Sequence, residues 1–335
     1  MSRYLFTAIA LKTLGSTSYS RSLYKKLGNR IGYRRRTELT ESYVRRGVWL
    51  LEHLTTLRLT DRNVTFLELG TGWMHFYSIF IRLFFDFRGV LYDVWDNRQL
   101  EPLKSNFEQL ADWLPTLACL SPNQRMRARE IIDQIASVES FDALYRLLNL
   151  EYVVDASATL SSLPRETYDI VFSFDVLEHV RARSLAQSIS NYHRVLKPGG
   201  YSIHQVGVDD HLSHYAPSAS PKRYQAFSDM RWKLFYENQV QYFNRVSYDE
   251  FRRLFLDGGF DETETYVDRS PAAFAGLKIA SNYRHQTKES LEAVRAYLFT
   301  ENHQRWRCHA RCDRAKLWRN FAQVPLRRTC LNFCV

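Results

Sequence analysis

The feature that most constrains this chain is a regular alternation of short apolar runs with longer stretches of helical periodicity. The runs have the length of strands and are rich in Val, Ile, Leu, Phe and Tyr, which favour extended structure. They cover residues 64–69, 89–93, 151–155, 168–174 and 201–206, with two weaker candidates at 260–267 and 274–280. Strands that alternate with helices favour a parallel sheet with helices on both faces. We therefore expect an α/β fold built on a doubly wound, mostly parallel sheet.

The remaining segments indicate how the chain is divided. Residues 61–285 form the expected sheet domain, between a basic helical N-terminal segment, 1–60, and a basic helical tail, 286–335. Inside the domain, residues 97–150 are helical by pattern and too long for one crossover, so we expect an insertion of extra helices. Residues 207–245 are polar, aromatic and irregular, and we expect a substrate lid there.

The positive charge of the chain is confined to its two ends. The net charge is +10, yet residues 61–300 hold 26 Lys and Arg against 31 Asp and Glu. Residues 1–60 hold 12 against 3, and residues 301–335 hold 8 against 2. A cleft that grips a nucleic-acid backbone is basic, so the slightly acidic body argues against nucleic acid as a partner. The stretch from Arg21 to Arg36 fits either an anionic membrane surface or a solvated basic helix, and both interpretations stay open.

The apolar pattern and the five cysteines bear on the cellular compartment. No run of about 18 apolar residues indicates a membrane-spanning helix, and no cleavage site follows the mildly apolar start. We therefore expect a cytoplasmic protein with reduced thiols, attached peripherally to the inner membrane face if the basic segment binds lipid. Two C-terminal cysteine pairs have three-residue gaps, where structural zinc pairs more often have two, so we expect no zinc there. These pairs are Cys308 with Cys312 and Cys330 with Cys334.

Glycines and carboxylates stand at the ends of the first three expected strands. A doubly wound sheet binds its ligands at the carboxyl ends of the strands. Gly70 and Gly72 would let the backbone approach a ligand and would free amides at the start of the next helix. Asp93 could accept both hydroxyls of a ribose, and Asp155 the exocyclic amine of an adenine. Each feature alone is more often a turn or a helix cap, but their order and spacing together favour a cofactor site.

Three longer motifs resemble those of class I methyltransferases, which use S-adenosylmethionine (SAM). Residues 68–72, Glu-Leu-Gly-Thr-Gly, look like the first motif of this family. Residues 168–180, from Tyr-Asp-Ile-Val to Val-Leu-Glu-His-Val, resemble its fourth-strand motif, and residues 194–200, Arg-Val-Leu-Lys-Pro-Gly-Gly, the loop before its fifth strand. The resemblance covers about 64–206 and implies a Rossmann-like sheet and SAM as the cofactor. The chain is similar to bacterial, type 11-like methyltransferases of small molecules and glycans.

The resemblance also implies roles for single residues. They are Glu68, Gly70 and Gly72 at the methionine part of SAM, Asp93 at the ribose, Asp155 and Ala156 at the adenine, and Asp175 facing the methyl-transfer site. Glu68 would either approach the amino group of SAM or order the loop.

Three positions test this assignment. Trp73 stands at the third glycine position of the family and makes the loop bulkier. Asp96 competes with Asp93 for the ribose, but the context Asp-Val-Trp-Asp-Asn favours Asp93. A dinucleotide site would need a glycine where His75 stands, which argues against NAD(P).

Methyl transfer from a sulfonium needs an aligned nucleophile and, for a hydroxyl, a proton acceptor. His211 and His214 follow the fifth strand and are candidate general bases, and Asp175 is a third candidate catalytic residue. For each one alone, a loop or core role is the more frequent outcome. Asp175-x-x-Glu178-His179 resembles a metal-binding pattern of some O-methyltransferase relatives, but hard cations usually take more oxygen ligands, so we expect no metal.

Together these features favour a SAM-dependent methyltransferase of a small molecule, a glycan or a lipid-linked saccharide, acting at oxygen. Residues 174–177, Phe-Asp-Val-Leu, lack the Asn/Asp-Pro-Pro motif of enzymes that methylate amines of nucleic acids. Two alternatives stay open. One is an RNA methyltransferase that uses the basic ends as arms, and the other is a non-catalytic methyltransferase-like scaffold in which Trp73 crowds the cofactor loop.

Overall fold

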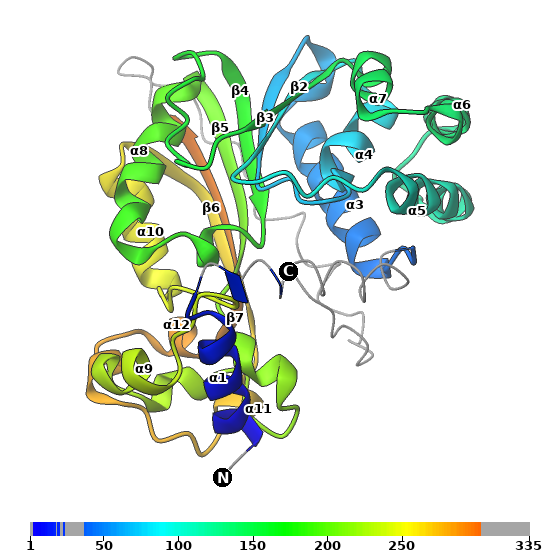
Figure 1. The fold of residues 1–335 in the computed structure, drawn as a ribbon. Coiled ribbons are helices and arrows are strands. Elements are labelled where there is room, and N and C mark those ends of the chain that lie inside the picture. The colour runs from blue at the N-terminus through cyan, green and yellow to red at the C-terminus, as the bar shows by residue number, and fades with distance from the viewer. Residues whose placement is uncertain (1–2, 18, 21–22, 24–36, 303–335) are drawn as a thin grey trace.

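The computed structural model describes residues 3–17, 19–20, 23 and 37–302. Its centre is a seven-stranded sheet with the order β3-β2-β1-β4-β5-β7-β6 (Figure 1). The strands are β1 (Thr65–Leu69), β2 (Arg88–Asp93), β3 (Leu150–Val154), β4 (Tyr168–Phe174), β5 (Leu196–Gly207), β6 (Phe260–Arg269) and β7 (Ala293–Asn302). The first five are parallel, and β7 runs antiparallel to both of its neighbours. The expected fold class, a Rossmann-like and mostly parallel sheet, is confirmed.

Helices cover both faces of the sheet (Figure 1). One face carries α3 (Glu41–Thr56), α4 (Phe76–Phe84), α5 (Leu100–Trp113), α6 (Pro122–Ser137) and α7 (Phe141–Leu148), and the other carries α8 (Leu185–Val195) and α10 (Tyr248–Asp257). Side chains alternate between the faces along each strand, so Phe66 lies in the first core cluster and Leu67 in the second. Short 3-10 turns lie at Leu59–Asp61, Leu114–Thr116, Leu177–His179, Ala182–Ser184, His211–Tyr215, Arg223–Ala226 and Ser281–Tyr283.

The long segment between β2 and β3 forms helices α5, α6 and α7, as its helical pattern predicts. The start of α6 shows why the chain turns there. The Ser121 hydroxyl accepts a hydrogen bond from the Gln124 amide, and the Gln124 side chain accepts one from the Ser121 amide. This capping box, with Pro122 at the first helical position, satisfies amides that the helix itself cannot pair.

Two expectations about the end of the domain are wrong. Residues 293–302, expected within a helical tail, form strand β7. Leu298 packs in the second core cluster and Phe299 in the first, so this strand is buried on both faces and its apolar run lacks a clear period. Residues 274–280, expected as a strand, begin with the last residue of the short helix α11 (Pro271–Phe274) and contain Gly276 with a φ of +73°, which extended backbone does not allow.

A third core cluster lies beyond the end of β5, where Figure 1 shows α1 (Arg3–Leu14), α9 (Asp229–Phe235) and α12 (Lys288–Glu292). Most aromatic residues that suggested a lid pack against each other here, namely Tyr224, Phe227, Trp232, Tyr236 and Phe243. Helix α1 belongs to this cluster, because Tyr4 is buried in it and donates a hydrogen bond of 2.6 Å to Asp210 Oδ2. These rings therefore serve packing.

The basic stretch from Arg21 to Arg36 lies, apart from Leu23, outside the described residues, and so do the C-terminal cysteine pairs. Within the described part of the chain, no helix combines the length and the apolar character that crossing a membrane requires.

Candidate functional site

The strand order reverses between β1 and β4, and the loops that leave these two strands touch each other. A Cβ atom added to Gly70, after β1, would lie 2.5 Å from Val176 Cγ2, after β4. Doubly wound sheets bind ligands in the crevice at such a reversal. The candidate site is therefore the group of polar residues at the carboxyl ends of β1 to β5.

The two glycines of the first loop have different surroundings. Gly70 has a φ of +63° and Gly72 a φ of +65°, so both adopt the left-handed conformation that glycine tolerates best. Gly70 is packed against Val176, whereas within the described part of the chain no atom outside Gly72 and its two chain neighbours lies within 4 Å of the Cβ position of Gly72. Trp73, one of these neighbours, packs against the first core cluster. Apart from its chain neighbours, Gly72 therefore faces open space.

The different surroundings predict different costs for the same substitution. Gly72→Ala should lower the free energy of unfolding by about 1–2 kcal/mol, the cost of a left-handed L-residue. Gly70→Ala should lower it by about 1–3 kcal/mol more, because the new methyl group collides with Val176. Urea unfolding of both variants measures the difference, and equal losses would contradict the close approach of the two loops.

Glu68 holds the glycine loop in place through hydrogen bonds to its carboxylate. Its carboxylate is buried and accepts hydrogen bonds from Thr71 Oγ1 (3.2 Å), from the Ser78 amide (3.2 Å) and from the Ser78 hydroxyl. The loop is thereby tied to the first turn of α4, whose helix dipole also favours a negative charge there. Burial nevertheless raises the pKa of Glu68 to about 7. Of the two roles expected for Glu68, these contacts favour the ordering of the loop.

The raised pKa of Glu68 makes the stability of the protein depend on pH. The unfolded chain has the ordinary carboxyl pKa near 4.5, so the folded state loses stability as the pH rises from about 4.5 through 7. Glu68→Gln removes this titration. The free energy of unfolding of the natural protein, relative to the variant, should fall on the order of 3 kcal/mol between pH 4.5 and pH 8. Urea titrations across this range measure it, and a constant difference would argue against a raised pKa.

Asp93, the last residue of β2, also contacts the glycine loop. Its Oδ2 accepts a hydrogen bond from the Gly72 amide (3.0 Å) and its Oδ1 one from the Val94 amide (2.7 Å). Burial raises the pKa of Asp93 against the effect of these amides. Asp96 instead forms an ion pair with Arg98 (2.7 Å) and is about half exposed. Of the two candidate ribose ligands, only Asp93 therefore contacts the glycine loop.

Asp155 follows β3 and lies beside Asp93, since its amide donates to the Asp93 carbonyl (2.9 Å). Its carboxylate accepts hydrogen bonds from the hydroxyls of Ser157 and Tyr92, both at 2.6 Å. These bonds, that of Ser157 most, lower the pKa of Asp155. Ala156 is exposed. The three expected cofactor positions thus stand side by side on adjacent strand ends, and the side chain of Asp155 is already engaged.

Asp175 adopts a left-handed φ of +54° directly after β4. It forms a 2.8 Å ion pair with Arg46 of α3 and accepts a hydrogen bond of 2.9 Å from Gln205 of β5. Burial favours the neutral acid, but the charges of Arg46 and Arg295 and the hydrogen bond from Gln205 together outweigh it and lower the pKa of Asp175. Nothing in the sequence singles out Arg46 or Gln205. Arg45, the chain neighbour of Arg46, is exposed and forms an ion pair with Glu41. Only the fold distinguishes the buried arginine from the exposed one.

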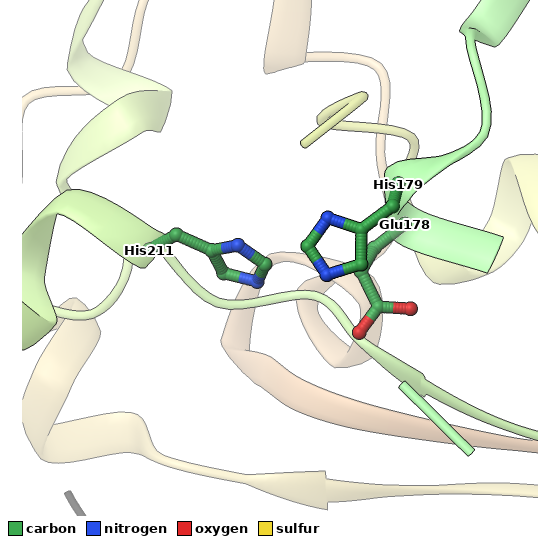
Figure 2. Close-up of side chains that lie close together, drawn as sticks. All are labelled: Glu178, His179 and His211. Atoms are coloured by element: carbon green, nitrogen blue, oxygen red, sulfur yellow. The ribbon is translucent and has the colours of Figure 1, made fainter. Parts of the chain in front are cut away.

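Glu178, His179 and His211 lie together (Figure 2), close enough to Asp175 for its charge to act on all three. Glu178 is 2% exposed; its Oε1 accepts a hydrogen bond from the Gly207 amide (3.0 Å) and its Oε2 has no partner. Burial and the negative charge of Asp175 raise the pKa of Glu178 well above its usual range. Burial also lowers the pKa of both histidines, that of His211 to about 4, so neutral imidazoles face a buried carboxyl group.

His214 lies next to this group, with its ring centroid 5.5 Å from that of His211. Its Nε2 lies 2.8 Å from Asp209 Oδ2. Burial opposes protonation of His214, but the hydrogen bond to Asp209 and the negative charges around the ring together raise its pKa. Burial likewise opposes ionisation of Asp209, but the bond to His214 and nearby charges, that of Arg295 included, lower its pKa to about 2. Asp175 contributes to the electrostatics of both histidines, so the three expected catalytic residues stand in one cluster.

Comparison with known proteins adds a family match. Residues 107–204 match the family model described as a methyltransferase domain. This range spans β3, β4 and most of β5 and begins after the glycine loop. A search of curated proteins finds no sequence that matches the chain.

Solved structures with a similar chain trace include three methyltransferases. The 1,6-didemethyltoxoflavin-N1-methyltransferase of Burkholderia thailandensis is 13% identical, with a TM-score of 0.44 and coverage of 85% of this chain and 87% of that one. Phosphoethanolamine N-methyltransferase 2 of Haemonchus contortus is 13% identical, with a TM-score of 0.41 and coverage of 76% and 52%. A SAM-dependent methyltransferase of Methanosarcina mazei is 16% identical, with a TM-score of 0.40 and coverage of 72% and 93%.

Proposed function

We propose that this protein is a SAM-dependent methyltransferase that methylates a hydroxyl oxygen of a small molecule, a glycan or a lipid-linked saccharide. One observation carries the proposal: an open glycine loop, braced by Glu68 and closed by Asp93, lies at the strand reversal beside a cluster of histidines and carboxylates. The match of residues 107–204 to a methyltransferase domain supports the same activity.

The residues around the loop fit SAM. The Asp93 carboxylate has about four lone-pair sites; the backbone amides of Gly72, Val94 and Trp95 occupy part of them, and what remains can accept from the ribose. The open space beside Gly72 leaves room for the ligand next to that carboxylate. Asp155 and Ala156 follow the next strand of the sheet, β3, where the adenine would lie. Because Tyr92 and Ser157 already bond the Asp155 side chain, the backbone of these two residues would contact the adenine at least as much as that side chain.

Bound SAM supplies a methyl group on a positively charged sulfur. The residues of the chain would hold the acceptor and take its proton. His214 suits this step because Asp209 holds its Nε2, which leaves Nδ1 to accept a proton. Asp175, kept ionised by Arg46, adds negative charge where the sulfonium approaches. The acceptor oxygen then bonds to the methyl carbon while the electron pair of the broken carbon–sulfur bond stays on sulfur.

A transfer assay tests the proposal. The full chain is incubated with SAM labelled in the methyl group and with pairs of acceptors that differ only in a free or a blocked hydroxyl. We expect label in the free hydroxyl member of at least one sugar or small-molecule pair, and none with Asp93→Ala. Label in RNA alone would favour the RNA methyltransferase. Binding of SAM without transfer to any acceptor class would favour the scaffold.

A further inference from the structure

Three side chains with metal-binding atoms converge beside the proposed transfer site. Glu178 and His179 come from the turn after β4, and His211 comes from the turn after β5. One ligand atom of each lies within 4.8 Å of those of the other two, and in Figure 2 the side chains face one another. Atoms bound to one zinc ion lie about 3.4 Å apart, so small rotations of the side chains would bring them to a common ion.

Two of these ligand atoms lack any hydrogen-bond partner. Glu178 Oε2 and His179 Nε2 are both shielded from solvent, and neither contacts a donor or acceptor in the described part of the chain. Native proteins seldom leave such atoms unsatisfied, because a buried carboxylate oxygen without a partner costs several kcal/mol. A bound cation would satisfy both atoms at once.

The surroundings fix these ligands in the form that binds a metal. His179 Nδ1 lies 2.7 Å from the Tyr242 carbonyl, so Nδ1 carries the proton and Nε2 keeps its lone pair. Glu178 Oε1 is oriented by the Gly207 amide. The turn itself is clamped by Asn244, whose amide donates to the Glu178 carbonyl and whose side chain donates to Leu177 and Val180. Such outer contacts are the usual support of metal ligands.

We propose that Glu178, His179 and His211 bind one divalent transition-metal ion, of the Zn²⁺ or Fe²⁺ class. Two imidazoles and one carboxylate suit these ions, whereas Mg²⁺ and Ca²⁺ prefer sets made of oxygen. Asp175 does not belong to the set, because Arg46 and Gln205 occupy its carboxylate. The expectation of no metal rested on the few oxygen ligands that the Asp175–Glu178–His179 pattern offers a hard cation, and that pattern omits His211.

On the proposed function, the ion serves the transfer step. Three protein ligands leave coordination positions for the acceptor oxygen, as at catalytic zinc sites. Bound there, the hydroxyl loses its proton more readily, and His214 next to His211 can take it. The oxygen then accepts the methyl carbon and sulfur keeps the electron pair. The metal would thus orient and activate the acceptor.

Metal binding is measured without SAM or acceptor, so its result is independent of the proposed function. The full chain, with its four C-terminal cysteines changed to serine, is stripped with a chelator and titrated with Zn²⁺, with Mg²⁺, and with Co²⁺ as a spectroscopic probe. We expect one Zn²⁺ per chain at micromolar concentration or below, and a Co²⁺ absorption band of nitrogen and oxygen ligation. Glu178→Gln and His211→Ala should each weaken Zn²⁺ binding at least about a hundredfold.

His285→Ala is the matched control, because His285 is exposed and far along the chain from the cluster. It should bind Zn²⁺ as the parent does. Circular dichroism and thermal unfolding establish whether each variant is folded. If His211→Ala does not fold, the isosteric variant Glu178→Gln alone decides the test. No bound Zn²⁺, equal affinity in all variants, or a preference for Mg²⁺ would overturn the inference. Zn²⁺ binding without SAM binding would instead refute the proposed function alone.

Discussion

Asp93→Ala is expected to weaken the binding of S-adenosylhomocysteine, the demethylated product of SAM, by at least about a hundredfold. The carboxylate lies beside the open face of Gly72 and can accept two ribose hydroxyls. Each hydrogen bond to a charged acceptor contributes about 1.5–3 kcal/mol, and about 1.4 kcal/mol corresponds to a factor of ten. Calorimetric titration of the folded variant measures the loss.

Asp155→Ala is the matched control for this experiment, because Asp155 ends the adjacent strand with the same side chain. Its carboxylate is engaged by Tyr92 and Ser157, so we expect a loss of affinity well below that of Asp93→Ala. Comparable losses for the two variants would mean that the carboxylate of Asp155, too, contacts the cofactor directly. A larger loss for Asp155→Ala would contradict the assignment of Asp93 to the ribose.

Arg46→Met is expected to lower the free energy of unfolding by about 2–4 kcal/mol. Removal of one partner from a largely buried ion pair leaves the other charge uncompensated, which typically costs about 3–5 kcal/mol. The side chains of Arg46 and Asp175 are each 20% exposed to solvent, so the lower part of that range applies. The pKa of Asp175 should rise in the variant, since Arg46 is the strongest of the groups that oppose the effect of burial on it. Urea unfolding at pH 7 measures the loss.

Two further variants separate this effect from a general response to lost arginine. Arg45→Met removes the adjacent arginine, whose pair with Glu41 is half exposed and is worth about 1 kcal/mol at most. The double variant Arg46→Met with Asp175→Asn should recover much of the stability, because no charge is left unpaired. Equal losses for Arg45→Met and Arg46→Met, or no recovery in the double variant, would show that the pair carries little energy.

The parallel part of the fold could be predicted from the sequence because its signals are local. The first four strands are compact, mostly apolar runs, β5 contains the run expected at 201–206, and the glycines and Asp93 mark where two of the strands end. Strand β7 could not be predicted, because it has no such local signal. Its residues are buried on both faces and carry neither the period of a helix nor that of a half-exposed strand, so only its pairing with β5 and β6 identifies it.

The candidate site likewise contains features that the sequence predicts and features that only the fold shows. The glycine loop and the carboxylates at the strand ends are fixed by position along the chain, and the sequence placed them correctly relative to the strands. Contacts between distant segments could not be seen. Arg46 reaches Asp175 across more than a hundred residues, and His211 joins Glu178 only because β4 and β5 are neighbours in the sheet. The aromatic residues of 207–245 were ambiguous in the sequence, because packing in a local core and stacking on a ligand require the same side chains, and most of these residues pack in the third core cluster.

The measurement that tests the central claim most directly is a calorimetric titration of the unmutated 335-residue chain with S-adenosylhomocysteine and, separately, with NAD⁺. We predict one site with micromolar affinity for S-adenosylhomocysteine and no binding of NAD⁺. Failure of the folded protein to bind S-adenosylhomocysteine, or tighter binding of NAD⁺, would contradict the account of the glycine loop and Asp93 as a SAM site.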